Sequence, residues 1–116
     1  MPQLSLHSLQ SLHIAMRRYL GDLALLQRRL RQSYSLGDYS AAQRLAEQLV
    51  TETLEQYGDT HPAHLSALSD HALLCKTVGE YEKAVEIYRK AYEGYSEGLG
   101  AGHRSAVTVL HNWGLT

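Results

Sequence analysis

The sequence has one cysteine, two prolines and no uninterrupted apolar stretch of the roughly 18 residues that a membrane-spanning helix needs. The single cysteine, Cys75, excludes an internal disulfide and suits a reducing compartment, so we expect a cytoplasmic protein. Proline occurs only at Pro2 and Pro62, which leaves long stretches free to be helical. The length of 116 residues fits a single domain.

Acidic residues are absent from the first twenty positions, which contain Arg17, Arg18 and several serines. This composition weakly resembles a mitochondrial presequence, so a mitochondrial location is the alternative to a cytoplasmic one. The same stretch also has the pattern of an amphipathic helix.

A large excess of either charge is also missing, because the formal net charge is −1. The total therefore gives no reason to expect binding to nucleic acid or to a membrane. The distribution is uneven: residues 1–36 hold five arginines against Asp22 alone, whereas residues 37–116 hold six basic against eleven acidic residues. Two interpretations stay open. In the first, the basic and acidic residues simply form solvated faces of the protein. In the second, the basic N-terminal end binds an acidic surface, either that of a second copy in head-to-tail self-association or that of an acidic partner.

An internal repeat becomes visible when the chain is shifted by 42 residues. The coincidences fall on turn glycines, small residues and residues that open helices. They pair Gly37 with Gly79, Tyr39 with Tyr81, Ala42 with Ala84, Glu55 with Glu97, Gly58 with Gly100, His61 with His103 and Leu68 with Leu110.

Each unit is predicted to be a pair of helices. Residues 62–78 place apolar side chains at three-and-four spacing, with Pro62 as a start signal and Gly79 as a stop signal. The other predicted helices span residues 22–36, 39–57 and 81–98. We expect Ala42, Ala46, Ala84 and Ala91 to allow close helix packing, and Tyr81, Tyr88 and Tyr95 to form a packing stripe.

The pattern resembles the tetratricopeptide repeat (TPR), in the 42-residue form of kinesin light chains. The residues that carry this resemblance are Val78-Gly79-Glu80-Tyr81, Ala84, Tyr88, Ala91, Leu99-Gly100 and His103, together with Tyr57-Gly58-Asp59-Thr60-His61-Pro62. The chain departs from that form at Arg104, which replaces a proline, and at Ser69-Asp70, which replaces an asparagine pair.

The resemblance implies an all-α fold: a right-handed superhelical stack of antiparallel helix hairpins, a TPR-like α-solenoid of five to six helices. We expect a single domain, 1–116, with an N-terminal capping helix at 4–20, a first repeat at 22–58 and a second at 61–99. Residues 103–116 would form the first helix of a third, incomplete repeat, so the chain is either a fragment of a longer array or covered there by a partner.

Residues suited to catalysis or metal binding are present but poorly arranged. His61, His64 and His71, spaced three and seven apart, could project on neighbouring faces of one helix. They do not make a complete ligand set, so we predict no metal site. Cys75 lies on the apolar stripe and is expected to be a buried structural thiol. The segment Gly98–Gly102 lacks the lysine and serine or threonine of a phosphate-binding loop. We therefore predict no enzyme and no cofactor.

The resemblance also implies a concave groove lined by the first helix of each unit. The residues that it assigns to this partner-binding face are Gln27, Arg31, Tyr34, Ser66, Ser69, Asp70, Leu73, Lys76, Thr77, His111, Asn112 and Leu115. Leu73 occupies a position where chaperone-tail-binding members have an asparagine, so that activity is not expected.

Three functions are compatible with this pattern. The first is a protein-interaction scaffold or adaptor that binds a peptide or helix of a partner protein in the groove. The second is a self-assembling structural module, with a homo-oligomer formed through the open C-terminal helix. The third is a regulatory or targeting segment of a longer multidomain protein.

Overall fold

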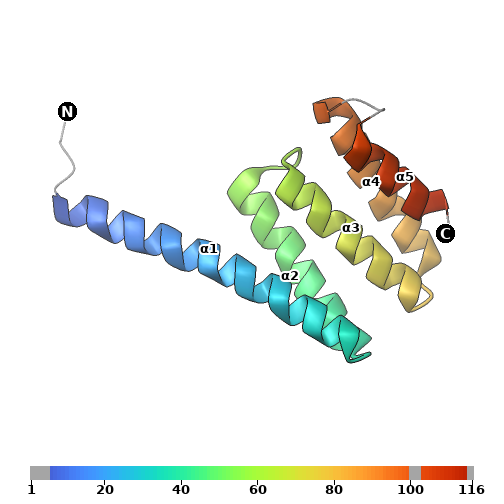
Figure 1. The fold of residues 1–116 in the computed structure, drawn as a ribbon, viewed down its shortest axis with the longest axis horizontal. Helices are drawn as coiled ribbons and strands as arrows, with labels where there is room; N and C mark the ends of the chain where they lie inside the picture. The colour runs from blue at the N-terminus through green and yellow to red at the C-terminus, as the bar shows by residue number, and fades with distance from the viewer. Residues whose placement is uncertain (1–5, 100–102, 115–116) are drawn as a thin grey trace.

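The computed structural model describes residues 6–99 and 103–114, which form five helices and no strand. The helices are α1 (Leu6–Ser35), α2 (Tyr39–Tyr57), α3 (Pro62–Thr77), α4 (Tyr81–Leu99) and α5 (Arg104–Gly114). Each helix packs on its neighbours in the chain, and α2 to α5 form a stack of antiparallel helices (Figure 1). The all-helical repeat fold predicted from the sequence is confirmed. Within the described ranges, no helix has the length and apolarity that crossing a membrane requires.

The 42-residue spacing is present in the structure. Helices α2 and α4 begin at Tyr39 and Tyr81, and α3 and α5 begin at Pro62 and Arg104. The turns that precede α2 and α4 have the same hydrogen bonds at this offset. The amide of Asp38 donates to the carbonyl of Ser33 at 2.9 Å, and the amide of Glu80 donates to the carbonyl of Cys75 at 2.8 Å. Both turns therefore have the same construction.

Glycine is required in these two turns by the backbone conformation. Gly37 has φ 78° and Gly79 has φ 88°, the left-handed region that residues with a Cβ rarely adopt. This conformation allows the six-residue hydrogen bond that closes the C-terminus of the preceding helix. A short turn then reverses the chain and produces an antiparallel hairpin.

Side chains that accept hydrogen bonds from free amides mark the helix starts. Asp38 accepts from the amide of Ala41 at 3.2 Å and caps α2. His61 Nδ1 accepts from the amide of Ala63 at 3.0 Å, and His103 Nδ1 accepts from Ser105 at 3.2 Å. The two histidines that the 42-residue offset pairs therefore both cap the start of a helix.

Two hydrophobic cores share α3. One core joins α1, α2 and α3 and consists of Leu23, Leu26, Leu30, Ala42, Ala46, Leu49, Ala67 and Leu74. The other joins α3, α4 and α5 and consists of Leu65, Ala72, Cys75, Ala84, Ile87, Tyr88, Ala91, Tyr95, Ala106 and Val109. Because α3 contributes to both, it links the two hairpins into one stack.

Small residues permit close helix packing, as expected. Ala42, Ala46, Ala84 and Ala91 have no solvent exposure. Gly94 of α4 lies directly against α3, because a Cβ atom at this position would overlap with the Leu65 side chain.

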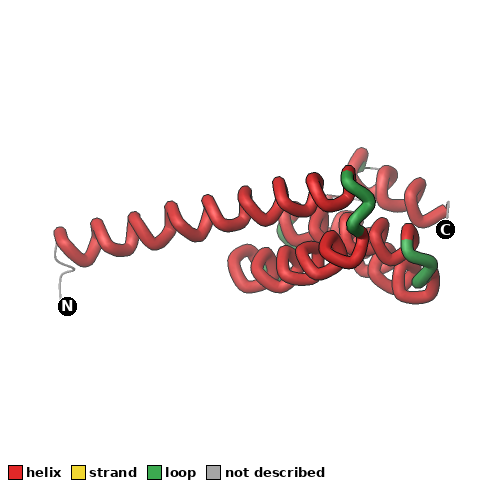
Figure 2. The backbone as a smooth tube through the Cα atoms, turned by 90° about the horizontal axis from the view of Figure 1, so that it is seen from below, coloured by secondary structure: helices red, strands yellow, loops and turns green. Residues whose placement is uncertain are grey.

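The first helix differs from the prediction. A separate capping helix at 4–20 and a break before residue 22 were expected, but α1 is continuous from Leu6 to Ser35. A single interior glycine costs about 1 kcal/mol relative to alanine, and Gly21 has no neighbouring proline, so the helix continues through it. The first half of α1 extends beyond the other helices rather than folding over the stack (Figures 1 and 2). Residues 4–5 of the expected helix and residues 115–116 of the expected third repeat lie outside the described residues.

The tyrosine stripe is only partly buried. Tyr88 and Tyr95 lie in the core as expected, but Tyr81 is 57% exposed because it occupies the first position of α4. At the other end of the stack, Val107 and Leu110 on α5 are about half exposed, at 50% and 48%. Within the described residues, nothing covers this outer face of α5.

We predict that Gly94→Ala destabilises the protein although alanine favours a helix. The new methyl group must displace the fully buried Leu65, and overpacking of this kind costs about 1–3 kcal/mol. Helix propensity returns up to about 1 kcal/mol, so the net change in the free energy of unfolding is unfavourable. Thermal unfolding followed by circular dichroism measures this change.

Gly98→Ala is the matched control, because a Cβ there meets no atom within 4 Å. It lies on the same helix and should leave the melting temperature unchanged or raise it. Equal melting temperatures for the two variants would contradict the packing of α3 on α4.

Candidate functional site

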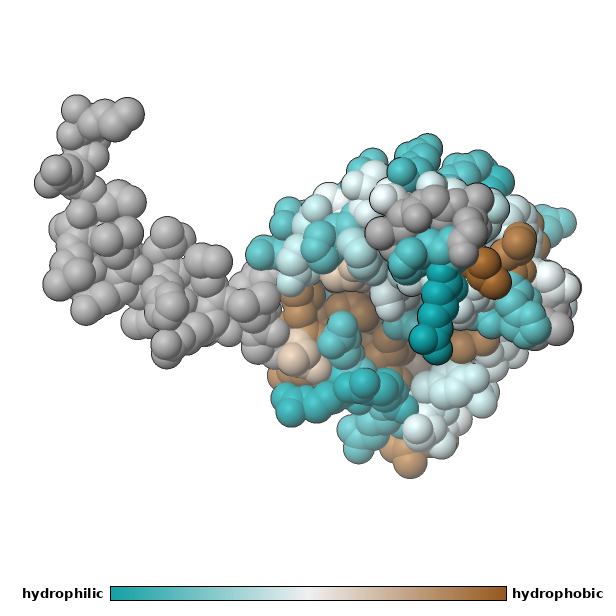
Figure 3. Space-filling view, turned by 45° about the horizontal axis from the view of Figure 1, so that its top comes forward, coloured by the Kyte–Doolittle hydropathy of each residue, from teal (hydrophilic) through white to brown (hydrophobic). Residues whose placement is uncertain are grey.

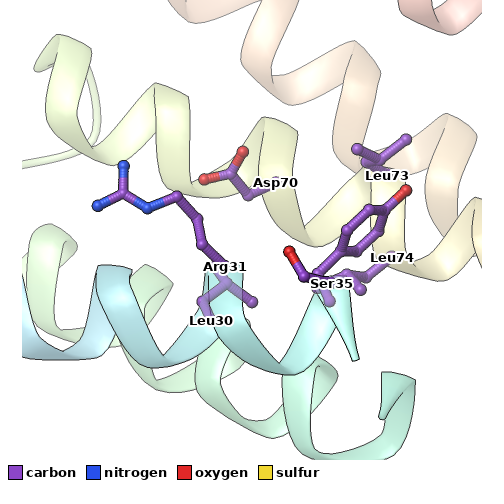
Figure 4. Close-up of a pocket in the computed structure, with 7 residues that line it drawn as sticks. Leu30, Arg31, Ser35, Asp70, Leu73 and Leu74 are labelled. Carbon is purple, nitrogen blue, oxygen red and sulfur yellow. The ribbon is translucent and has the colours of Figure 1, made fainter. Parts of the chain in front are cut away.

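A pocket of about 430 Å³ lies between α1 and α3. Its lining comes from these two helices alone and comprises Leu30, Arg31, Tyr34, Ser35, Asp70, Leu73 and Leu74 (Figure 4). Leu30 and Leu74 belong to the first core and are only 6% and 2% exposed, so they form an apolar floor. The pocket is therefore a hollow in the groove between successive first helices of the repeat.

Two partly exposed side chains rise from the floor. Tyr34 and Leu73 expose 38% and 39% of their surface. The ring of Tyr34 contacts the ring of Tyr39 edge to face, with 5.5 Å between the ring centres, which restrains its orientation. Figure 3 shows that patches of apolar residues lie among hydrophilic ones on the face of the stack in this view.

Opposite charges stand on the two sides of the pocket. Arg31 comes from α1 and Asp70 from α3, and Figure 4 shows the Arg31 side chain reaching past the Asp70 carboxylate. Asp70 is open to solvent on one side, but the surrounding protein displaces enough water to raise the pKa of its carboxyl group. The positive charge of Arg31 partly opposes this rise. Neither side chain forms a hydrogen bond or ion pair within the described part of the chain.

Four of the predicted groove residues meet in this pocket: Arg31, Tyr34, Asp70 and Leu73. Three others are occupied within the protein. The Ser69 hydroxyl donates to the carbonyl of Leu65 at 3.2 Å, the Thr77 hydroxyl donates to the carbonyl of Leu73 at 2.8 Å, and Lys76 Nζ lies 3.5 Å from the carbonyl oxygen of Asn112.

The remaining predicted residues lie outside the pocket. Gln27, Ser66 and His111 are exposed, and Asn112 is half-buried on α5. Leu115 lies outside the described residues. Sequence reasoning missed Leu30, Ser35 and Leu74. The two leucines have the spacing of core residues, and only the gap between α1 and α3 shows that they also form the pocket floor.

Two of the three histidines that suggested a metal site are engaged elsewhere, and the buried Nε2 of the third, His71, has no hydrogen-bond partner among the described residues. His61 caps α3, and His64 Nδ1 lies 3.2 Å from the Thr53 hydroxyl in the interior. His71 Nε2 is 3.7 Å from the Glu47 carboxylate. Among the residues that the structure describes, no three His, Cys, Asp or Glu side chains are grouped to hold a metal ion.

Cys75 is fully buried in the second core. Burial raises the pKa of its thiol, so the nucleophilic thiolate is disfavoured at neutral pH. This arrangement matches the structural role predicted from the sequence.

Comparison with known families gives one result. The model of a family described as "Tetratricopeptide repeat" matches residues 33–97, which are 65 of the 116 residues. The match begins at the end of α1 and covers both turns that contain Gly37 and Gly79. A search of curated proteins found no match.

We predict that the protein loses stability as the pH falls below about 6.5. Burial lowers the pKa of both His64 and His71 from the ordinary value of 6.5, and the Lys83 charge lowers that of His71 further. The Val50 carbonyl and Asp59 near His64, and Glu47 and Glu80 near His71, only partly oppose burial. The unfolded chain therefore takes up protons near pH 6.5, where the folded chain does not.

The measurement is the melting temperature between about pH 7.5 and about pH 5.5. The variant with His64→Gln and His71→Gln should show a flatter dependence on pH than the wild type. His111→Gln, which alters an exposed histidine of α5, is the control and should retain the wild-type slope. Parallel pH profiles for all three proteins would show that the buried histidines do not cause the effect.

Proposed function

The chain belongs to the tetratricopeptide repeat family, and we propose that it is an interaction module that binds a partner protein in the groove between α1 and α3. Repeats of this family generally mediate protein–protein interaction, and the family is one of non-enzymatic scaffolds. The proposed ligand is a peptide or a helix of the partner, which would lie across the pocket.

The observation that carries this proposal is the pocket with an apolar floor and one charge of each sign at its sides. Leu73 and Tyr34 supply apolar contact area, which favours a large apolar side chain as the anchor of the ligand. The guanidinium of Arg31 pairs with carboxylates in two-pronged geometry, and Asp70 accepts from a basic side chain or a backbone amide. The fitting ligand therefore has an apolar residue between an acidic and a basic one.

Three finer features belong to the same proposal. The 42-residue register supports the kinesin-light-chain-like form of the repeat, and the mixed polar groove supports a scaffold or adaptor role. A cytoplasmic location is in keeping with a single buried cysteine that stays reduced.

We predict that Leu73→Asp weakens peptide binding. Peptides are first selected from a random display library on the immobilised wild-type chain, and their dissociation constants are then measured by fluorescence anisotropy. Replacing the exposed leucine with a carboxylate removes apolar area and places a second negative charge beside Asp70. The dissociation constant should rise about tenfold or more. Leu36→Asp changes a leucine that is 76% exposed and outside the pocket, so it should leave the affinity unchanged.

Arg31→Glu is expected to change which peptides are selected. A groove with two carboxylates and no guanidinium should lose the preference for an acidic residue and select basic ones instead. If peptides selected on the wild type bound the Arg31→Glu and Leu73→Asp variants as tightly as before, the groove between α1 and α3 would not be the binding site.

A further inference from the structure

The first half of α1 is not required by the repeat. Subtracting the 42-residue period from α3 (62–77) gives residues 20–35, so the repeat accounts for the second half of α1 only. Residues 6–19, which we name the arm, extend beyond the stack as a continuous helix (Figures 1 and 2). A helix of this length is only marginally stable in water by itself, so an arm without a binding partner would be expected to fray.

The sequence of the arm continues the apolar pattern of the packed half. In the packed half, Leu23, Leu26 and Leu30 are buried in the first core. Counting from Leu23 toward the N-terminus in alternating steps of four and three residues gives Tyr19, Met16, Leu12 and Leu9. A regular seam of this kind is the pattern of a helix that packs on another helical surface.

The charge of the arm differs from that of the rest of the protein. Residues 1–21 contain Arg17 and Arg18 and no acidic residue, whereas residues 37–116 have five more acidic than basic residues. Pairing between two arms would place no carboxylate beside the arginines of either copy, because the arm contains none. The acidic part of a second copy is the complementary surface.

A second cavity of the stack has the complementary chemistry. It measures about 500 Å³ and is formed by the C-terminal halves of α2 and α4 and the start of α3. Its apolar lining includes Val50, Leu54 and Leu68, and Leu54 is 45% exposed. Asp59, Glu93 and Glu97 also line it, although Glu93 is already paired with Arg89 at 2.9 Å. Lys90 is the one lysine or arginine in the lining. We name this the acidic cavity.

We propose that the arm of one copy binds in the acidic cavity of a second copy. The apolar seam of the arm would pack on Val50, Leu54 and Leu68, and Arg17 and Arg18 would lie close to Asp59, Glu93 or Glu97. This surface is separate from the pocket between α1 and α3, so self-association would leave the proposed peptide-binding site open.

The test uses the full chain and one variant of each surface. The arm variant carries Leu12→Asp and Met16→Asp, and its control is Gln10→Asp, which adds a negative charge off the apolar seam. The cavity variant is Leu54→Lys, and its control is Leu36→Lys, which changes an exposed leucine outside both cavities. Circular dichroism and the melting temperature establish that each variant remains folded.

Sedimentation velocity from micromolar to submillimolar concentration is the measurement. The wild type and both controls should self-associate in a concentration-dependent manner, and raising the salt concentration should weaken this. The arm variant and the cavity variant should each show an apparent dissociation constant raised about tenfold or more. Mixing these two variants should produce a one-to-one complex, because the arm of one and the cavity of the other are both intact.

Four results would overturn the proposal. These are a monomeric wild type throughout the range, association that survives the arm substitutions, association that survives Leu54→Lys, and a mixture that remains monomeric. If the wild type stayed monomeric in solution but bound anionic lipid vesicles through the arm, the partner of the arm would be a membrane rather than a second copy. None of these results bears on peptide binding between α1 and α3, so the two proposals can fail independently.

Discussion

Helix α3 carries apolar side chains on two sides, and the stack depends on the burial of both. Ala67 and Leu74 pack against α1 and α2, whereas Leu65, Ala72 and Cys75 pack against α4 and α5. Neither hairpin alone can cover these two sides, so a single pair of helices would leave one of them in water. The need to bury both sides of α3 therefore fixes the order and direction of the stack.

The groove follows from the same constraint. Each second helix of a repeat, α2 or α4, packs between two first helices, so α2 separates α1 from α3. This leaves a gap between α1 and α3, which the side chains of these two helices only partly fill. The leucines of the core form the bottom of this gap, and the charged residues Arg31 and Asp70 stand at its sides. Repeats of this family generally mediate protein–protein interaction, and an apolar floor between opposite charges fits the binding that we propose there.

The sequence predicted the parts of the fold that depend on local backbone chemistry. Gly37 and Gly79 mark turns that need a left-handed residue, and Pro62 marks a helix start, so the limits of α2, α3 and α4 were predicted to within one residue. The break at Gly21 was wrong because one glycine does not outweigh the hydrogen bonds of a long helix. In the groove, Arg31, Tyr34, Asp70 and Leu73 were assigned by the resemblance to the repeat family, and all four line the pocket. Leu30 and Leu74 were not assigned to it, because spacing alone does not distinguish a core side chain from one that also faces a gap.

Amide hydrogen exchange of the intact chain tests the central role of α3 most directly. Helix α3 is buried against α1 and α2 on one side and against α4 and α5 on the other. Its interior amides therefore exchange only when both cores are disrupted. They should therefore be the slowest to exchange, slower than those of α5, whose outer face is uncovered. Exchange from α3 at the rate of α5 would contradict the account, because it would show that the two hairpins are not held together through this helix.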